Sequence, residues 1–376
     1  MEQRAKRPTA LVTGGAGFIG SHLSEALLAD GSEVYVLDDL STGSLENVAH
    51  LRERRDFHLV VESVLSPAVV NELVYKSDVV YHLAAVVGVR LIIEQPVRTL
   101  LTNVRGTDIV LEHAHRFGKR VLLASTSEVY GDHRVQEPLP EDALRVYGPT
   151  TARRWAYADS KAMDELLALA YHQERGLDCV IARLFNTVGP RQSGQYGMVV
   201  PRFVGRALAG GPLEIHGDGT QTRCFCHVVD TVGALMSLMA APVASGEIYN
   251  VGSQESIRIV DLAHRVLEMT HSESRLAFVP HEEVYGQGIE DMYHRIPATG
   301  KIEAAVGWRA SRDLDTILAD VVEDARTRIV PVEPRNAAAA GSQSAFTRGA
   351  ANAPDVGEQL VGELPAEARS RLPGGH

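Results

Sequence analysis

The first half of the chain, up to about residue 186, alternates short runs of β-branched residues with longer segments of helical periodicity. The runs indicate buried strands, and the periodic segments indicate helices that connect them. Because such helices must cover the faces of the sheet, the pattern is typical of an α/β fold with a doubly wound parallel sheet. Gly31, Gly118 and Gly176 follow three of the helices as stop signals. We expect strands at 10–13, 33–37, 58–61, 79–83, 120–125 and 179–185, and helices at 20–29, 67–75, 97–117 and 155–175.

The pattern becomes irregular after Asn186, where glycine and proline pairs separate shorter elements. We expect a smaller C-terminal lobe there, which closes over a ligand, and a short returning segment that rejoins the main domain. The end of the chain is rich in Ala, Gly, Pro and Ser and loses periodicity, which predicts a disordered tail. The expected divisions are 8–186 for the main domain with about 228–254 returning to it, 187–227 and 255–330 for the lobe, and 331–376 for the tail.

Composition and charge narrow the classes of function. The chain has 48 acidic and 37 basic residues, which gives a formal net charge of −11. That balance argues against a nucleic-acid partner and against binding to an anionic membrane. The N-terminus carries no signal-peptide hydrophobic region, and no apolar run approaches the length of a membrane span. We therefore expect a cytoplasmic enzyme.

Cysteine usage argues against a disulfide framework and against a metal site. The chain has only Cys179, Cys224 and Cys226. Cys224-Phe-Cys226-His227 has two thiols and an imidazole, but it alternates like a strand and lacks further ligands. Since a structural zinc ion usually takes about four ligands, we expect buried thiols and no metal.

Thr13-Gly-Gly-Ala-Gly-Phe-Ile-Gly20 follows the first expected strand and opens the first expected helix. Gly15, Gly17 and Gly20 match the spacing G-x-G-x-x-G, which permits a tight turn, a close approach of backbone to pyrophosphate, and close packing of helix on strand. The start of the helix then presents unpaired N–H groups to the phosphates. A plain turn is the alternative for the glycines alone. The expected cofactor contacts are Gly14, Gly17, Phe18, Ile19 and Gly20.

An acidic residue follows at the end of the second expected strand. Asp38 can accept hydrogen bonds from the adenosine ribose hydroxyls of a dinucleotide. Together with Asp39 it would repel a 2′-phosphate, and no arginine stands beside the pair to receive one. The sequence therefore favours NAD over NADP. The alternative is that one of the two carboxylates, Asp39 in particular, caps the next turn.

Tyr157 and Lys161 are four residues apart, so a helix places one above the other on the same face. A free tyrosine has a pKa of about 10 and needs nearby positive charge to act as a base near neutral pH. Lys161 and an oxidised nicotinamide would supply that charge, and Tyr157 could then take a proton from a sugar hydroxyl. A surface helix pair is the alternative, which the glycine loop upstream disfavours.

These motifs together resemble the extended short-chain dehydrogenase/reductase family that acts on nucleotide sugars. The resemblance also rests on His82-Leu-Ala-Ala85, on Asn103 in Asn-Val-Arg-Gly-Thr107 and on Arg183-Leu-Phe-Asn186. It extends from about residue 8 to residue 328. It implies a Rossmann domain that binds NAD, a lobe that binds the nucleotide sugar, and a homodimer through the helices at 97–117 and 155–175.

The same resemblance implies which residues meet the ligands. Tyr157 would be the base, Thr126 would contact the sugar O4, and Asn186 and Arg223 would bind the nucleotide diphosphate. An arginine suits that place because its planar fork pairs with phosphate through two hydrogen bonds. Ser63 stands where an aspartate often contacts adenine. The remaining implied contacts are Val64, Leu83, Ala84, Ala85, Asn103 and Lys161 for the cofactor, and Val200, Tyr285 and Arg295 for the substrate.

Glu128, in Ser125-Thr-Ser-Glu-Val-Tyr-Gly131, helps to separate the chemistries of the family. A carboxylate beside a buried sheet is costly unless it is paired or used. A strand end rich in Ser and Thr with one Glu resembles the UDP-glucuronate decarboxylases. Arg154-Trp-Ala-Tyr157 and the stretch from Tyr285 to His294-Arg-Ile-Pro297 resemble them too. A 4-epimerase, a 4,6-dehydratase and a non-catalytic NAD-sensing protein are the alternatives.

The chemistry implied by that resemblance starts with oxidation at C4 of UDP-glucuronate. The resulting ketone is β to the C6 carboxylate, so CO2 can leave while the electrons of the broken bond pass into an enolate. Glu128 would repel the carboxylate or act through a water as proton donor, unless it only bonds local hydroxyls. Arg295 would hold the carboxylate or protonate C5, unless it lies on the surface. The product would be UDP-xylose after reduction, or a released UDP-4-keto-pentose.

Overall fold

The computed structural model describes residues 8–88, 92, 95–133, 137–194, 198–280, 283, 292 and 294–328. Tyr285 and the segment 331–376, for which the sequence predicts a substrate contact and a disordered tail, lie outside the described residues. The described residues all fall within one compact unit. The division of that unit into a main domain and a smaller lobe stays a prediction.

Seven parallel strands form the central sheet, in the order β11-β6-β5-β4-β1-β2-β3. The strand order reverses between β1 and β4, because the chain returns to the middle of the sheet after β3. The structure thereby confirms the doubly wound α/β fold. The strands are β1 (Ala10–Thr13), β2 (Val34–Asp38), β3 (Phe57–Val61), β4 (Val79–His82), β5 (Arg120–Thr126), β6 (Cys179–Leu184) and β11 (Glu247–Val251).

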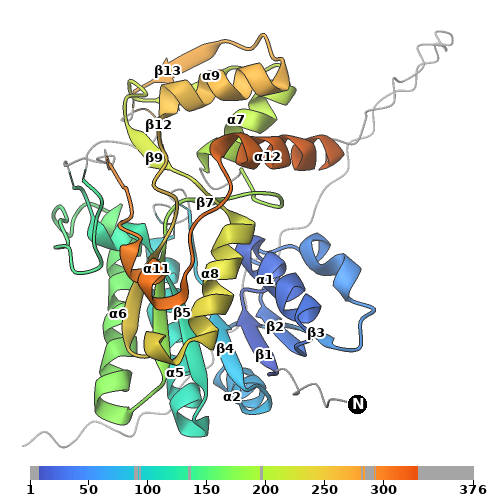
Figure 1. Ribbon diagram of the computed structural model, residues 1–376, viewed down its shortest axis with the longest axis vertical. Coiled ribbons are helices and arrows are strands. Elements are labelled where there is room, and N and C mark those ends of the chain that lie inside the picture. Colours follow the sequence, from blue (N-terminus) through green and yellow to red (C-terminus); the bar gives the residue numbers. More distant parts are fainter. Residues whose placement is uncertain are drawn as a thin grey trace, which may run out of the picture. The chain divides into compact units, whose positions relative to one another are not determined.

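Helices cover both faces of this sheet (Figure 1). On one face α1 (Phe18–Ala29) and α8 (Val228–Ala240) pack through leucines and valines onto strand residues such as Val12. On the other face α2 (Pro67–Lys76), α5 (Gly106–Phe117) and α6 (Trp155–Arg175) pack onto strand residues such as Leu11. Successive strand residues face opposite sides, so both sides must be apolar. This requirement explains the continuous apolar runs of the sequence.

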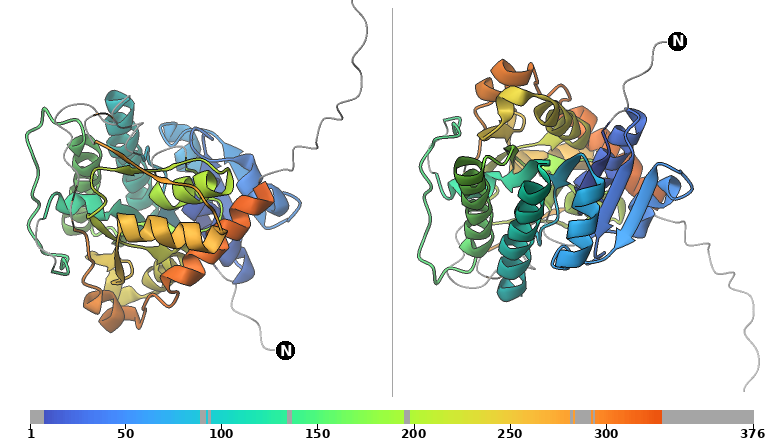
Figure 2. Two further views of the ribbon diagram at one scale, coloured as in Figure 1. Left: turned by 90° about the horizontal axis from the view of Figure 1, so that it is seen from above. Right: turned by 90° about the horizontal axis from the view of Figure 1, so that it is seen from below.

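The segment expected as one helix at 97–117 has three helical parts. A short α4 (Pro96–Leu100) leads into a single π-helical stretch, η2 (Leu101–Arg105), and then into α5 (Gly106–Phe117). The second view in Figure 2 shows α5 beside the long helix α6 (Trp155–Arg175). Gly118 and Gly176 end their helices in the left-handed conformation, as expected. Gly31 also has a positive φ, of 89°, and lies just beyond Asp30, the C-cap of α1.

The strands after Asn186 are short, with two to five residues each, as the sequence predicts. The helices are not shorter, since α12 has 15 residues and α1 has 12. Of the segments after Asn186, α8 and β11 return to the sheet, where β11 pairs in parallel with β6. Figure 1 shows the helices α7, α9 and α12 grouped together with β13. The remaining elements are η1 (Leu45–Leu51), η3 (Ser127–Tyr130), β7 (Thr187–Val188), α7 (Val199–Leu208), β8 (Leu213–His216), β9 (Thr222–Cys224), β10 (Cys226–His227), η4 (Pro242–Ala244), β12 (Ser256–Arg258), α9 (Ile259–Thr270), β13 (Leu276–Val279), α11 (Gly300–Val306) and α12 (Leu314–Arg328).

The three cysteines are buried free thiols, as expected. Burial raises the pKa of Cys224 to about 11 and that of Cys226 to about 12, so these thiols stay protonated at neutral pH. Within the described part of the chain, no helix combines the length and the apolar character that crossing a membrane requires.

Candidate active site

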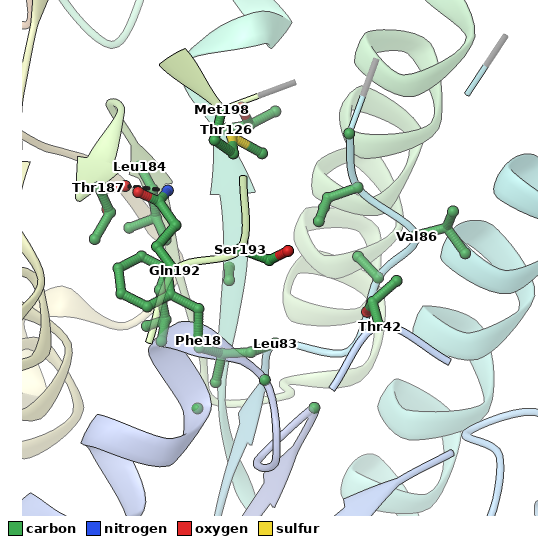
Figure 3. Close-up of a pocket in the computed structure, with 18 of the residues that line it drawn as sticks. Phe18, Thr42, Leu83, Val86, Thr126, Leu184, Thr187, Gln192, Ser193 and Met198 are labelled. Atoms are coloured by element: carbon green, nitrogen blue, oxygen red, sulfur yellow. Dashed lines mark hydrogen bonds between the residues drawn. The ribbon is translucent and has the colours of Figure 1, made fainter. Parts of the chain in front are cut away.

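One cavity of about 760 Å³ opens at the carboxyl ends of the sheet strands. Its lining includes Gly14 after β1, Leu83 after β4 and Thr126 at the end of β5. Figure 3 shows Phe18, Leu83 and Thr126 around this cavity. In doubly wound sheets ligands bind outside the carboxyl edge, where the strand order reverses. The cavity lies at that place, between β1 and β4.

The glycine loop leaves no room for side chains. Gly14 has a φ of +72°, and a Cβ there would lie 2.9 Å from the backbone nitrogen of Ala84. A Cβ on Gly20 would collide with the backbone oxygen of Gly14. Helix α1 begins at Phe18, and no side chain caps its N-terminus. The backbone N–H groups of the first turn are therefore available to an anion in the cavity.

Asp38 lies at the end of β2 and lines the same cavity. Its carboxylate accepts hydrogen bonds from the backbone nitrogens of Ala16 at 2.9 Å and Leu40 at 2.8 Å. Burial raises the pKa of Asp38, and these backbone donors oppose the rise. Asp39 accepts a hydrogen bond from the backbone of Ser41, which confirms its capping role. The glycine loop, the N-terminus of α1 and the carboxylate of Asp38 together fit the binding of a dinucleotide.

Tyr157, near the start of α6, points at the end of β5. Its hydroxyl is hydrogen-bonded with Thr126, whose own Oγ1 accepts from the backbone nitrogen of Glu128 at 3.2 Å. Burial and then the nearby charge of Glu128 raise the pKa of Tyr157, while the hydrogen bond with Thr126 opposes the rise. The phenol is therefore protonated at neutral pH in this structure.

Lys161 follows one turn later on α6 and also lines the cavity. Its Nζ donates to Oδ2 of Asp164 at 2.7 Å, and both side chains are buried. No sequence motif includes Asp164. A carboxylate three residues after a lysine is common on helix surfaces, where both side chains are solvated. The pair of Lys161 and Asp164 differs because both side chains are buried at the cavity.

Arg295 and Glu128 form the second charged pair of the site. Arg295 Nη1 lies 3.6 Å from Glu128 Oε1, and the guanidinium also donates to Ser127 at 3.3 Å and to Asn186 at 3.4 Å. Arg295 is 8% exposed, so the alternative of a surface arginine is wrong. The carboxylate of Glu128 is ion-paired, so it does more than bond local hydroxyls. Residues distant in sequence thus meet beside Tyr157.

A buried network supports the end of β5 from behind. Glu165 on α6 accepts from Arg183 Nε at 2.9 Å and Nη2 at 2.8 Å, and from Ser125 Oγ at 2.5 Å. Arg183 also lies over the ring of Tyr130, with 4.7 Å between its guanidinium carbon and the ring centroid. Since Ser125 immediately precedes Thr126, this network fixes the backbone that presents Thr126 and Glu128.

Two of the expected cofactor contacts lie outside the cavity lining. Asn103 is buried, accepts from the backbone nitrogen of Val86 at 2.8 Å and donates to Ser160 at 3.0 Å. It therefore joins the segment after β4 to helix α6. Ser63 accepts from the backbone of Leu65, and its neighbour Glu62 lines the cavity instead. Direct contact of Asn103 or Ser63 with a cofactor stays a prediction.

The substrate side of the cavity brings together the other expected residues and adds several more. Asn186, Val200 and Arg223 all line it, and Asn186 Nδ2 donates to the backbone oxygen of Cys224 at 2.8 Å. In the sequence, the stretch after Gly189-Pro190 is recognisable only as a break in the pattern. Basic or polar cavity residues without a sequence signal include Arg191, Gln192, Arg202, His216 and Gln221, and Arg154, known only from a stretch that resembles the decarboxylases, joins them.

Fold and site together define a dinucleotide-dependent enzyme class with a Tyr/Lys pair, and comparisons with known proteins agree. The profile of the NAD dependent epimerase/dehydratase family matches residues 10–252. A UDP-N-acetyl-alpha-D-glucosaminuronate decarboxylase of Bacillus cytotoxicus is 41% identical, over 78% of this chain and 90% of its own length. UDP-glucuronic acid decarboxylase 1 of Danio rerio is 37% identical, over 80% of this chain and 69% of its own length.

The solved structures show the same relationship. UDP-glucuronic acid 4-epimerase from Bacillus cereus, crystallised with UDP-glucuronic acid and NAD, superposes with a TM-score of 0.77 at 27% identity. The match covers 85% of this chain and 99% of that one. The chain belongs to the NAD-dependent epimerase/dehydratase family, and NAD is its cofactor.

Proposed function

We propose that this protein is an NAD-dependent decarboxylase of UDP-glucuronic acid. The observation that carries the proposal is the ion pair between Glu128, at the end of β5 beside Tyr157, and the buried Arg295. In the proposed reaction these two charged groups would lie next to the C6 carboxylate, where they can act on its charge and on the proton that C5 receives. Relatives named as decarboxylases of UDP-linked uronic acids support the same reaction.

Tyr157 would act first, as the base that takes the proton of the sugar 4-hydroxyl. Bound NAD would accept a hydride from C4, which leaves a ketone there. Thr126 already bonds the phenol, so it is placed to orient the same hydroxyl. Lys161 would add positive charge beside the phenol and so favour its ionised form. The glycine loop, the start of α1 and Asp38 would hold the dinucleotide.

Loss of CO2 would follow from the position of the ketone. The C4 carbonyl is β to the C6 carboxylate, so the electrons of the breaking C5–C6 bond can flow into it. Glu128 would raise the energy of the bound carboxylate by repulsion between like charges. Arg295, which is ion-paired with Glu128, would guide a proton to C5. Reduction of the ketone would give UDP-xylose, and early release would give UDP-4-keto-pentose.

A second candidate substrate differs at C2. The Bacillus cytotoxicus relative is named for the N-acetylated glucosaminuronate, and it is more similar than the relatives named for UDP-glucuronic acid. Both substrates carry the C6 carboxylate, so the proposed reaction is the same for either. A 4-epimerase would instead keep the carboxylate, and a 4,6-dehydratase would need a hydroxyl at C6.

Turnover with labelled substrate tests the proposal. The NAD-loaded protein is mixed with UDP-glucuronate whose carboxylate carries an isotope label, and in parallel with the 2-acetamido uronate. We expect labelled CO2 and a UDP-pentose or its 4-keto form from at least one of them. Epimerised substrate without labelled CO2 would favour the epimerase alternative and reject the decarboxylase. Tyr157→Phe serves as the inactive control.

We also propose a homodimer through α6 and the α4–η2 segment, which contact one another. Large apolar side chains on these two elements are exposed: Val97, Leu101, Met163 and Leu166. Light scattering should give twice the mass of one chain, and Leu166→Asp should lower it toward one chain. A wild-type mass equal to that of one chain would reject the dimer.

The cytoplasmic location expected from the sequence stays a prediction.

A further inference from the structure

Arg154 is a buried cation that the proposed chemistry has not used. It lines the cavity one turn before Tyr157 and is 9% exposed. Its Nε is buried without a hydrogen-bond partner, and no hydrogen bond or ion pair joins its guanidinium to another described residue. The buried Arg183, in contrast, pairs with Glu165 through two hydrogen bonds. Arg154 therefore faces the cavity with its capacity to bind an anion unused.

Aromatic packing holds this guanidinium in place. Its central carbon lies 5.2 Å from the ring centroid of Trp155, close enough for a cation–π interaction. Trp155 is itself buried and stacks on Tyr147, with 5.2 Å between ring centroids and 19° between planes. Gly148 leaves room for this ring, since a Cβ there would lie 2.7 Å from Trp155 Nε1. Arg154 is thus preorganised before any ligand arrives.

A buried charge without a partner is costly, so such a site calls for an anion. Three anionic groups would enter the cavity with cofactor and substrate. The cofactor pyrophosphate has the glycine loop at the start of α1, and Arg223 on β9 is the expected partner of the nucleotide diphosphate. Arg154 lies three residues before Tyr157, and residues at that spacing on a helix are neighbours. The anion nearest to Tyr157 would be the sugar carboxylate, whose carbon is two bonds from C4.

Resting on the proposed function, we propose that Arg154 binds the C6 carboxylate of the substrate and selects uronates over neutral sugars. Arg295 already contacts Glu128, Ser127 and Asn186. In this proposal Arg154 binds the substrate carboxylate, and Arg295 stays paired with Glu128. A cation bound to the carboxylate stabilises its charge, whereas loss of CO2 requires that charge to move toward C4. Arg154 therefore contributes to binding and selection, and its loss raises KM more than it lowers kcat.

Calorimetric titrations of the NAD-loaded protein test this assignment. UDP, UDP-glucose and UDP-glucuronate are each titrated into Tyr157→Phe protein, alone or combined with Arg154→Gln or Arg154→Lys, so that turnover adds no heat; the control variant carries Tyr157→Phe too. We expect Arg154→Gln to weaken UDP-glucuronate binding by about 10- to 100-fold, as for a lost charge-assisted hydrogen-bond pair. Binding of UDP and UDP-glucose should stay within about twofold. Arg154→Lys should restore part of the preference, because it keeps the charge without the fork.

The neighbouring Arg153→Gln is the matched control, since Arg153 is exposed and lies outside the cavity lining. It should bind all three ligands as Tyr157→Phe alone does. Equal weakening of all three ligands by Arg154→Gln would place Arg154 on the diphosphate. NAD is titrated separately into the NAD-free protein, and weakening of NAD binding alone would place Arg154 on the cofactor. Either result, or no change, overturns the assignment. Selective binding of the acid without release of CO2 would reject the proposed reaction and leave this assignment standing.

Discussion

Lys161 and Asp164 form a buried ion pair within one turn of α6, with 2.7 Å between Nζ and Oδ2. The lysine is therefore not a lone positive charge beside Tyr157. The carboxylate of Asp164 contributes to the raised pKa of Tyr157, after burial and after the charge of Glu128. Asp164 thus positions the ammonium and at the same time opposes ionisation of the phenol.

Replacement of Asp164 by Asn should shift the pH dependence of turnover. Loss of this negative charge lowers the pKa of Tyr157, so the base form is present at lower pH. The acid limb of the profile of kcat/KM against pH should move to lower pH. Glu128 and Thr126 also act on the pKa of the phenol. Burial, and after it the charge of Lys161, lowers the pKa of His82 to about 3, so this imidazole is neutral over the range of the profile.

Asp159→Asn is the control for that shift, because Asp159 is exposed and is not among the charges that act on Tyr157. Its profile should match that of the wild type. An acid limb that stays in place in Asp164→Asn, or moves to higher pH, would contradict the role of Asp164.

Tyr157→Phe should remove turnover and leave NAD affinity nearly unchanged. The variant keeps the ring but loses the group that takes the proton, and general bases typically contribute about 10²- to 10⁴-fold to rate. Steady-state assays and NAD titration measure the two effects separately. A variant with wild-type turnover would exclude Tyr157 as the base.

Gly20→Ala should sharply weaken NAD binding. Its Cβ would collide with the backbone oxygen of Gly14, so the glycine loop would have to open. Gly205→Ala on α7 is the control, because a Cβ at Gly205 meets no atom within 4 Å. Fluorescence titration with NAD should separate the two variants. Equal affinities would show that the loop does not bind the cofactor.

Glu165→Leu should destabilise the fold. It leaves Arg183 buried without its carboxylate, a change that typically costs about 3–5 kcal/mol in the free energy of unfolding. Urea unfolding measures the loss. The double variant with Arg183→Met should recover most of it, since both charges are then absent. A single variant as stable as the wild type would show that the network behind β5 does not support the fold.

The sequence predicts the sheet well because its signals are local. Apolar runs locate each strand of the first half to within a residue at either end, and Gly118 and Gly176 stop their helices because they adopt positive φ. The π-helical stretch at Leu101–Arg105 has no such signal. A π turn depends on packing between helices, which periodicity does not record.

The residues of the candidate site also fall into two groups, those that a sequence motif predicts and those that only the structure reveals. Gly20, Asp38 and Tyr157 belong to motifs with fixed spacing, and all three line the cavity. Asp164 belongs to no motif that the sequence shows, and Arg154 belongs to a stretch whose resemblance to the decarboxylases gives it no role; burial is what distinguishes both residues. A charged residue in a helical segment is usually solvated, and only the three-dimensional structure distinguishes the buried ones.

The most direct test of the central claim is a single turnover of NAD-loaded protein with labelled UDP-glucuronate, followed by absorbance and by release of labelled CO2. If oxidation at C4 creates the ketone that receives the electrons, the absorbance of reduced nicotinamide rises before or together with CO2, and Tyr157→Phe shows neither signal. Release of CO2 without any reduced nicotinamide, or reduced nicotinamide that is never followed by CO2, would contradict the account.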